Sequence, residues 1–237
     1  MRPALCIVMP VLDEAANLTA QLRVLKPLRQ RGARLVVVDG GSRDDTLAIA
    51  REHADLAFSA LPGRASQMNA GAAACPADVV LFLHADTVLP DNADLLVQRA
   101  TLGSFAWGRF DVQIASSRRV LTLVAAMMNL RSRWSGIATG DQAIFVRYEL
   151  FRHVCGFPDQ PLMEDIAISR LLKNHSHPAC LREKVTTSAR RWEQHGVWRT
   201  ILLMWRLRAA YFLGADPRDL AVQYGYRSRR SENNAIH

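Results

Sequence analysis

The spacing of apolar residues over the first hundred positions alternates between the periods of strands and helices. Unbroken apolar runs predict buried strands at Leu5–Met9, Arg34–Asp39, Asp55–Ser59 and Asp78–His84. Apolar residues at helical spacing predict helices at Ala15–Leu28, Thr46–His53, Arg64–Ala74 and Pro90–Ala100. Strands that alternate with helices are typical of a parallel sheet covered on both faces. We therefore predict an α/β fold.

The second half of the chain has a less regular pattern. It predicts strands at Gly108–Ala115 and Gln142–Arg147, and helices at Val120–Leu130 and Ile166–Leu172. A long helix over residues 197–213 is apolar almost all round, with Arg199 and Arg206 on one face and Arg208 on the opposite face. Such a helix is buried or lies against another surface. Residues 225–237 are interpreted as a hydrophilic tail, and no linker is evident.

Composition and charge narrow the class of protein. The 237 residues are 49% hydrophobic, which excludes a disordered chain. Residues 1–100 carry 10 basic and 11 acidic side chains, whereas residues 101–237 carry 20 basic and 11 acidic ones, and 27 of the 30 basic residues are arginine. A basic, arginine-rich half suits anionic partners, although a solvated surface explains most of these arginines equally well. We expect no nucleic-acid partner.

The four cysteines lie far apart and form no CxxC, so we predict free thiols in a reducing compartment. No uncharged apolar run approaches the ~20 residues of a membrane span, and acidic residues come too early for a secretory signal. We expect a cytoplasmic protein, either soluble or at a membrane surface.

Polar residues follow three predicted strands at the edge where parallel sheets bind ligands. They lie in Pro10–Glu14, Asp39–Ser42 and His84–Asp86. Asp39 could accept hydrogen bonds from a nucleoside, or simply form a turn before two glycines. On an extended chain the side chains of His84 and Asp86 point to the same side. Asp86 could hold Mg²⁺ or Mn²⁺, or be a loop residue beside a hydrogen-bonded histidine.

Three further polar segments stand at predicted helix starts. Arg64 and Gln67 open a helix, which suits a diphosphate, although a surface arginine is the simpler interpretation. Ser42–Asp45 has the pattern of a capping box. Glu164-Asp165 precedes Ile166–Leu172, where acidic residues are favourable for structural reasons alone. The segments Gly140-Asp141-Gln142 and Arg190-Arg191-Trp192 are weak signals singly.

Several common motifs are missing from the sequence. No GxGxxG follows the first strand, and no GxxxxGK[ST], HExxH, GxSxG or cysteine–histidine metal spacing occurs. These absences weaken the oxidoreductase, P-loop, hydrolase and zinc-protein interpretations.

Taken in order, the polar segments resemble the motifs of family 2 glycosyltransferases of the GT-A fold. The matching segments are Pro10-Val-Leu-Asp-Glu14, Val38–Thr46, Gly63–Gly71, His84-Ala-Asp86 and Glu164-Asp165, and together they cover about residues 4–175. GRAxQMNxGA, FLHADT and GDQ further resemble a small bacterial group, the radical-SAM/selenodomain-associated transferases, which includes arsenosugar-biosynthesis glycosyltransferases.

The resemblance implies a role for each motif. Glu14 and Asp39 would contact the nucleoside, and Arg64 the base or the diphosphate. Asp86 would coordinate a divalent cation, Mn²⁺ or Mg²⁺. Asp165 would be the general base, supported by Glu164. The remaining nucleotide-sugar contacts would be Pro10, Leu12, Gln67, Asn69, His84 and Ala85, and the acceptor-side residues would be Asp141, Gln142, Arg191 and Trp192.

The sequence departs from the family pattern at three positions. Leu12 replaces a tyrosine that would stack on the base, so no nucleotide preference is implied. His84 replaces the first acid of DxD, which leaves Asp86 as the one certain carboxylate. Arg191-Trp192 is similar to the end of the QxxRW motif of processive relatives, but Ser188 holds the glutamine position, so processive polymerisation is not implied.

We therefore predict one GT-A-type domain over residues 1–195, with a mostly parallel, Rossmann-like nucleotide-binding half (1–103) and an acceptor-side half (104–195). Residues 196–237 would form a C-terminal helix and tail packed on this domain. The expected activity is metal-dependent, hexosyltransferase-like transfer from a nucleotide-diphosphate sugar to a hydroxyl acceptor, either a small molecule or lipid-linked. Because no second carboxylate is evidently placed as a covalent nucleophile, we expect inversion.

Two alternatives stay open. A nucleotidyltransferase would use a similar sheet, but its glycine-rich N-terminal signature is missing. A non-catalytic nucleotide-sugar-binding or membrane-surface protein is favoured by His84 in place of an acid. Peripheral contact with a membrane would involve residues 197–213.

Overall fold

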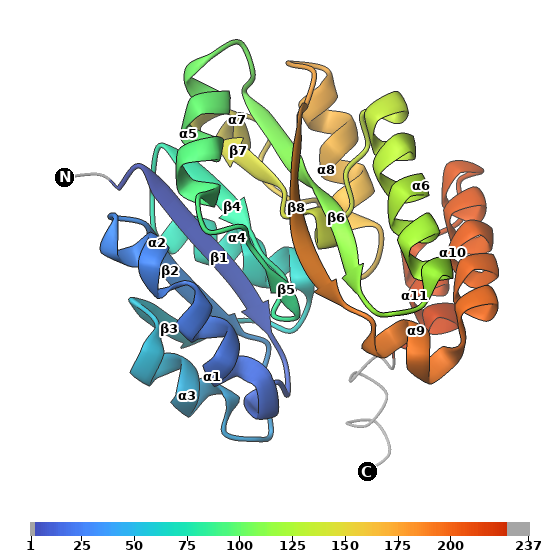
Figure 1. The fold of residues 1–237 in the computed structure, drawn as a ribbon, viewed down its shortest axis with the longest axis horizontal. Helices are drawn as coiled ribbons and strands as arrows, with labels where there is room; N and C mark the ends of the chain where they lie inside the picture. The colour runs from blue at the N-terminus through green and yellow to red at the C-terminus, as the bar shows by residue number, and fades with distance from the viewer. Residues whose placement is uncertain (1–2, 227–237) are drawn as a thin grey trace, which may run out of the picture.

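The computed structural model describes residues 3–226, which form an eight-stranded sheet with helices on both faces (Figure 1). The strand order is β3-β2-β1-β4-β7-β6-β8-β5. The strands are β1 (Leu5–Val11), β2 (Arg34–Asp39), β3 (Leu56–Ser59), β4 (Val79–Phe82), β5 (Thr87–Val88), β6 (Trp107–Ala115), β7 (Phe145–Arg147) and β8 (Ala179–Ser188). The first four strands pair in parallel, β7 runs antiparallel to β4 and β6, and β8 is parallel to β6 but antiparallel to β5. The predicted mostly parallel α/β sheet is confirmed.

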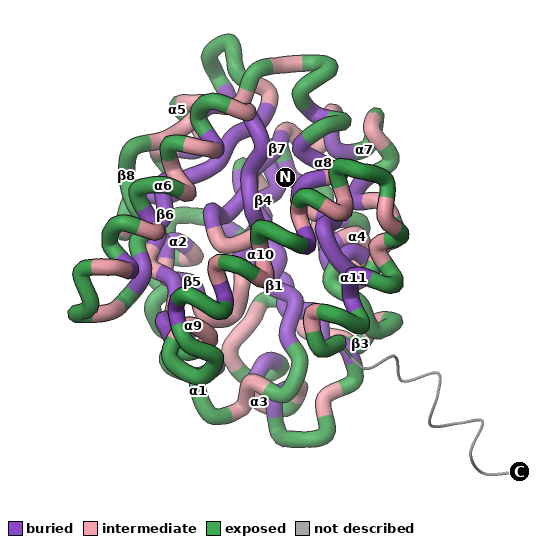
Figure 2. Tube along the Cα trace, turned by 90° about the vertical axis from the view of Figure 1, so that its right-hand side faces the viewer, coloured by how far each residue is buried: buried purple, intermediate pink, exposed green. Residues whose placement is uncertain are grey.

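Alternating side chains of the strands divide the core between the two faces of the sheet. On one face Leu5, Ile7 and Met9 of β1 pack with α1, α2, α3 and α5, and on the other Cys6 and Val8 pack with α4, α7 and α8. Figure 2 shows β1 and β4 buried through the centre of the molecule. The helices are α1 (Ala15–Val24), α2 (Lys26–Gln30), α3 (Thr46–His53), α4 (Arg64–Ala74), α5 (Ala93–Leu102), α6 (Arg119–Ser135), α7 (Tyr148–His153), α8 (Glu164–Lys173), α9 (Arg190–His195), α10 (Val197–Phe212) and α11 (Pro217–Tyr224), with a 3-10 turn, η1, at Gly140–Gln142.

Helix α4 lies unusually close to the sheet because Gly71 has no side chain. A Cβ atom at this position would overlap Val8 and come within 3.0 Å of a methyl group of Val38. The glycine therefore lets the helix rest on β1 and β2, and α4 presents Arg64 at its first residue.

Four expectations for local structure are corrected. The helix predicted over Ala15–Leu28 divides at Leu25, because Pro27 has no N–H to continue it. Ser42 does not cap α3, since its hydroxyl bonds to Asp39, and Asp44 instead accepts the Thr46 N–H at 3.1 Å. The helix expected from Pro90 begins at Ala93. The strand expected from Gln142 begins at Phe145, because η1 takes up residues 140–142.

The C-terminal part of the described chain contains two helices where one was expected. Helix α10 matches the prediction over residues 197–213, but α11 was not predicted. Both pack through Leu207 and Leu220 against Ile137 and Ile166. The predicted tail lies outside the described residues from position 227 onward.

The structure also bears on the cysteines and on a possible membrane span. All four cysteines are free thiols, as predicted. Within residues 3–226, no helix combines the length and apolar character needed to cross a membrane.

Candidate functional site

Polar side chains gather where β1, β2 and β4 end, and two amides hold this edge of the sheet together. The buried Gln67 amide donates to the carbonyl oxygens of Val11 at 2.9 Å and Val38 at 2.7 Å, which ties the ends of β1 and β2. Asn69 exchanges two hydrogen bonds of 2.9 Å with the backbone of Phe157. Both candidate ligand residues thus serve the scaffold, and contact with a nucleotide stays a prediction for each.

Asp39 lies at the end of β2 and is only 2% exposed. Its carboxylate accepts the N–H groups of Gly41 at 2.9 Å and Ser42 at 3.1 Å, as well as the hydroxyls of Ser42 and Ser59. The turn interpretation accounts for the bonds from Gly41 and Ser42, whereas the Ser59 hydroxyl comes from β3. They also fix a carboxylate at the ligand edge of the sheet.

The loop after β1 is held to the far end of the domain by a single ion pair. Pro10 is buried within β1, whereas Leu12 is exposed. An oxygen of Glu14 lies 2.9 Å from Nη2 of Arg190, and this pairing raises the pKa of Arg190, as does the negative charge of Asp86. Arg190 therefore brings α9 to the end of β1.

Asp86 and Arg190 line a cavity of about 550 Å³ bordered by β5, β8 and α9. The Asp86 carboxylate accepts a bond of 3.3 Å from the Thr87 hydroxyl, and the Asp86 carbonyl oxygen accepts the Ser188 N–H at 3.1 Å. This cavity is large enough for part of a nucleotide sugar.

His84 does not share this cavity, contrary to the extended-chain expectation. Strand β4 ends at Phe82 and the chain turns at Ala85 and Asp86, so the two side chains line different cavities. His84 lies with Glu164 and Asp165 around a second cavity of about 10 Å³. Burial and the charge of Arg64 lower the pKa of His84 to about 3, which keeps the imidazole neutral.

The acidic pair begins α8, after Met163 in a left-handed conformation. The two oxygens of Asp165 accept the Gly140 N–H at 3.0 Å and the Ile166 N–H at 2.7 Å. Burial of Glu164 and the negative charge of Asp165 raise the pKa of Glu164 to about 7, although Arg64 opposes the shift. Both residues thus line the small cavity beside His84.

Arg64 lies within electrostatic reach of this acidic pair. Burial lowers the pKa of the Arg64 guanidinium, but electrostatic interactions with Tyr226, Glu164 and Asp165 raise it. The net result is a pKa above its ordinary value. The start of α4 and the start of α8 are therefore brought together, as the resemblance requires.

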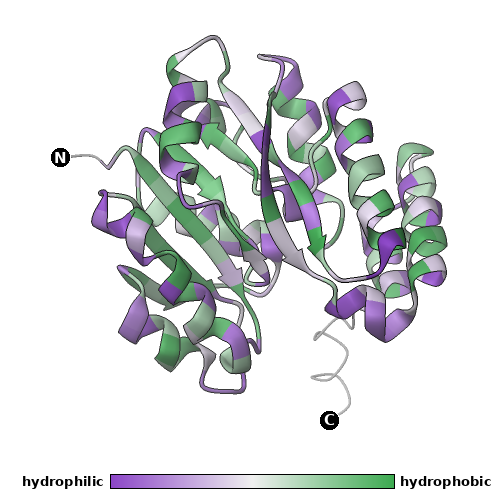
Figure 3. Cartoon of the chain, viewed as in Figure 1, coloured by the Kyte–Doolittle hydropathy of each residue, from purple (hydrophilic) through white to green (hydrophobic). Residues whose placement is uncertain are grey.

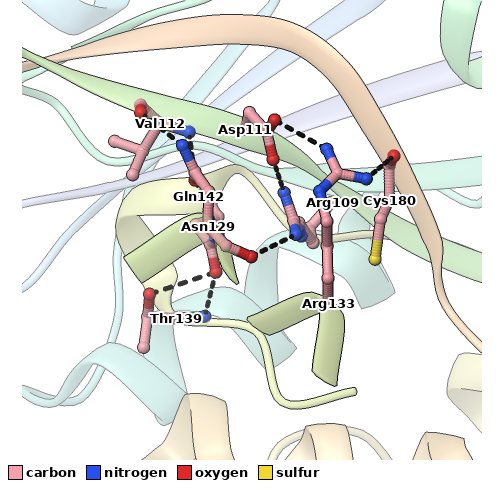
Figure 4. Close-up of polar contacts among 8 residues, drawn as sticks. All are labelled: Arg109, Asp111, Val112, Asn129, Arg133, Thr139, Gln142 and Cys180. Carbon is pink, nitrogen blue, oxygen red and sulfur yellow. Dashed lines mark hydrogen bonds and ion pairs between the residues drawn. The ribbon is translucent and has the colours of Figure 1, made fainter. Parts of the chain in front are cut away.

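The acceptor-side candidates divide between scaffold and surface. The Thr139 hydroxyl donates to Asp141 at 2.5 Å, and burial raises the pKa of this carboxyl. Gln142 is fully buried, and its amide accepts the Thr139 N–H and donates to Asn129. Figure 4 shows the bonds of Gln142 beside the network in which Arg109 and Arg133 share Asp111.

The other two candidates on this side follow β8. The guanidinium of Arg191 lies over the ring of Tyr224 in α11, 3.8 Å from its centre. Trp192 packs with Leu121 and Ala125 of α6. Neither contact involves the acidic pair directly.

Sequence reasoning missed the parts of the site that come from the C-terminal helices. Arg190 was noted only as part of a weak segment, and Tyr224 lay in no predicted element. Arg131 and Arg208, described below, converge near Asp165 from α6 and α10. An arginine on the inward face of an apolar helix, as at Arg208, was the one available signal.

A divalent cation needs oxygen ligands, and Asp86 is the candidate that could supply one. In the part of the chain that the structure describes, no three histidine, cysteine, aspartate or glutamate side chains cluster as a ready-made metal site. Asp86 offers one carboxylate, which accepts a hydrogen bond from the Thr87 hydroxyl. Carboxylate and phosphate oxygens are the ligands that Mg²⁺ and Mn²⁺ prefer, so Asp86 fits an ion that a diphosphate would share.

Part of the chain is similar in sequence to known proteins. Residues 6–116, just under half of the chain, match the family model described as glycosyl transferase family 2. Over 93 residues the chain is 34% identical to uncharacterized glycosyltransferases of Mycobacterium bovis and Mycobacterium tuberculosis. That alignment covers 39% of this chain, and the chain spans only 40% of the length of these relatives.

Solved structures share the fold at low sequence identity. Residues 1–349 of TarS from S. aureus align with a TM-score of 0.63 and 15% identity, covering 80% of this chain and 61% of that one. The mannosyltransferase PcManGT from Pyrobaculum calidifontis, in complex with GDP-Man and Mn²⁺, aligns with a TM-score of 0.61 and 17% identity, covering 89% and 61%. The fold is thus the GT-A fold, and the comparisons support an enzyme of the glycosyltransferase class.

Proposed function

Because residues 6–116 carry the sequence pattern of glycosyl transferase family 2, we propose that this protein moves a sugar from a nucleotide-diphosphate sugar to a hydroxyl acceptor. One observation carries the proposal. Arg64, His84 and the pair Glu164-Asp165 come from segments far apart in the sequence, yet lie around one small cavity or within electrostatic reach of it.

The proposed division of labour follows from these positions. Asp165, fixed by two backbone N–H groups, takes the proton of the acceptor hydroxyl. Arg64 and Arg190 neutralise charge on the departing diphosphate, and Glu14 and Asp39 contact the nucleoside. A divalent cation held by Asp86 would add further charge stabilisation at the diphosphate. With one carboxylate in the base position and none proposed as a nucleophile, the reaction inverts the anomeric configuration.

A donor screen tests the proposal directly. UDP-, GDP-, dTDP- and CDP-sugars would be added to the full chain with and without Mn²⁺, and the melting temperature recorded. A bound donor at a hundred times its dissociation constant stabilises the folded state by about 2.7 kcal/mol. A screen without any shift would contradict the proposed function. Binding without turnover would favour the non-catalytic alternative, and release of pyrophosphate from an added nucleoside triphosphate and sugar 1-phosphate would favour the nucleotidyltransferase one.

The narrower resemblance to radical-SAM/selenodomain-associated transferases rests on the motifs of the sequence alone. Within the proposed function it suggests a small-molecule acceptor. PcManGT was solved with GDP-Man and TarS with UDP-GlcNAc, so a hexose donor is the natural first choice in the screen.

The first prediction concerns the metal role of Asp86. Chelation of divalent ions should weaken binding of the nucleotide diphosphate by about tenfold or more, since the ion shares its charge with the diphosphate. Asp86→Ala should remove this dependence on the ion. Isothermal titration calorimetry with EDTA or Mn²⁺ measures both. The exposed Asp91→Ala is the matched control, and equal affinity of the unchanged protein in both conditions would disprove the role.

The second prediction concerns the outer side of α10. Val197, Thr200 and Leu207 are buried against the domain, but Trp198 is 72% and Trp205 68% exposed. Helix α6 beside it exposes Leu123, Met127, Leu130 and Trp134. Figure 3 shows hydrophobic and hydrophilic residues mixed along both helices. Exposed apolar surface of this extent, with Arg199 and Arg206 alongside, fits an anionic membrane.

We therefore expect the full chain to sediment with phosphatidylglycerol vesicles at low salt. Replacing Trp198 and Trp205 with alanine should lower the bound fraction strongly, whereas Leu102→Ala, which changes an exposed leucine elsewhere, should not. Absence of sedimentation at low salt would leave α10 with its packing role alone.

A further inference from the structure

Two arginines from different helices converge beside Asp165. Arg131 lies in α6 and Arg208 in α10, and Figure 1 shows these helices side by side. They pack through Val124 and Ile201, and Leu207, the neighbour of Arg208, packs with Ile166 at the start of α8. The inward face of α10 thus meets the acidic pair.

The guanidinium groups of these arginines have unused donors. Nε and Nη2 of Arg131 and Nε of Arg208 are buried and find no hydrogen-bond partner among the described residues. Nε of the neighbouring Arg109 is also buried without a partner, but Arg109 and Arg133 differ in that both form an ion pair with Asp111 (Figure 4). Buried donors in folded proteins are nearly always paired, so three unused ones at one place indicate a missing acceptor.

The charged groups at this place are close to one another but not paired. Burial, together with the positive charges of Arg208 and Arg109, lowers the pKa of Arg131 to about 10, although Asp141 and Asp165 oppose the shift. The two aspartates face the same cluster, but no ion pair of the described residues joins either to Arg131 or Arg208. Their carboxylates instead accept the Thr139 hydroxyl and the N–H groups of Gly140 and Ile166.

We propose that Arg131 and Arg208 bind a phosphate group of the acceptor and thereby hold its hydroxyl at Asp165. This inference rests on the proposed function, in which Asp165 is the base. Guanidinium groups match phosphate oxygens in shape and charge. A phosphate dianion balances the charge of two cations, whereas a carboxylate balances only one. Anchoring the acceptor at one end positions its hydroxyl for attack. The acceptor class is therefore a phosphorylated alcohol.

Calorimetry with three small probes tests the subsite. Glycerol 3-phosphate, glycerate and glycerol carry a phosphate, a carboxylate or neither, and are titrated into the full chain with its donor site filled by a nucleoside diphosphate. Glycerol 3-phosphate should bind most tightly. Arg131→Gln and Arg208→Gln should each weaken it by about tenfold or more, the effect of losing a charged hydrogen bond. Arg199→Gln, on the exposed side of the same helix, should have no effect.

The outcomes separate this inference from the proposed function. Arg64→Gln should weaken binding of the nucleotide but not of glycerol 3-phosphate. Arg131→Gln should weaken binding of glycerol 3-phosphate but not of the nucleotide. Nucleotide binding without any phosphate binding would overturn the subsite alone, and glycerate binding as tightly as glycerol 3-phosphate would overturn the assignment to phosphate. Because the unpaired arginines serve a ligand, both variants should keep or raise the melting temperature, and a clear fall in both would indicate a structural role instead.

A second arm identifies the source of the phosphate. Arg131→Gln and Arg208→Gln are tested on vesicles that contain phosphatidic acid, which presents the group from a lipid, in a chain that also carries Trp198→Ala and Trp205→Ala so that the outer side of α10 does not mask the subsite. Preference for the vesicles would indicate a lipid-borne acceptor, and preference for soluble glycerol 3-phosphate a small one. Arg131→Gln should lose phosphate binding in either case.

Discussion

Asp165→Asn is expected to slow sugar transfer ~100- to 10,000-fold while nucleotide binding survives, because a general base typically contributes that much to the rate. Asparagine keeps the shape of the side chain but has no basic oxygen. Its carbonyl oxygen can still accept one of the two N–H groups, from Gly140 or Ile166, that the carboxylate now accepts. Release of the nucleoside diphosphate from the donor found in the screen measures the rate, with calorimetry for affinity.

The control for this variant is Asp159→Asn, which makes the same change at an exposed position of the same half of the chain. Its rate should match that of the unchanged protein. Normal turnover by Asp165→Asn would refute the assignment of the base. A product that retains the donor's anomeric configuration would refute the single displacement, and loss of the fold would favour the helix-capping role of the acidic pair.

Glu164→Gln is expected to stabilise the protein above neutral pH and to flatten the dependence of stability on pH. In the folded protein burial and Asp165 raise the pKa of Glu164 from 4.5 to about 7. The folded state therefore holds a proton that the unfolded chain releases between these values. The free energy of unfolding falls as pH rises through this window, by about 3 kcal/mol in total. Glutamine carries no charge, so it removes this loss.

Thermal melts between pH 5 and 8 measure the effect. The difference in melting temperature between Glu164→Gln and the unchanged protein should grow with pH, by roughly 2–4 °C for each kcal/mol. The exposed Glu149→Gln should follow the unchanged protein throughout. Parallel curves for Glu164→Gln would show that the carboxyl is ionised at its ordinary pKa in the folded protein.

The elements that the sequence predicted well are those decided by local pattern. The buried strand β2, and helices α3 and α4, agree with the predicted bounds, because their apolar residues face a single core. Strand β8 was missed because its middle, Arg182 to Lys184, is charged and exposed, and only pairing with β6 and β5 makes it a strand. Helix α11 was missed for a related reason, since two buried residues, Leu220 and Ala221, hold it to α10 and its neighbours.

The residues of the candidate site likewise divide into those that a local sequence pattern predicts and those that depend on packing between distant elements. Asp39, His84 and the acidic pair could be predicted, since each follows or begins an element with a clear pattern. The different orientations of His84 and Asp86 could not, because they depend on a turn after β4 that the sequence pattern does not distinguish from continued strand. Arg131 and Arg208 could not be predicted together, because only the packing of α6 against α10 brings them close.

The place of β8 in the sheet has a consequence for how the chain is made. Strand β5 pairs with β8 across 100 residues of sequence. Most of β6 also pairs with β8, which is made later. During translation β1 to β4 can assemble as soon as they emerge, but the edges of β5 and β6 stay open until residues 179–188 have left the ribosome. Open edges attract other strands, so nascent chains that stall between β6 and β8 are the species most prone to aggregate. A chaperone that delays folding would have its greatest effect in that interval.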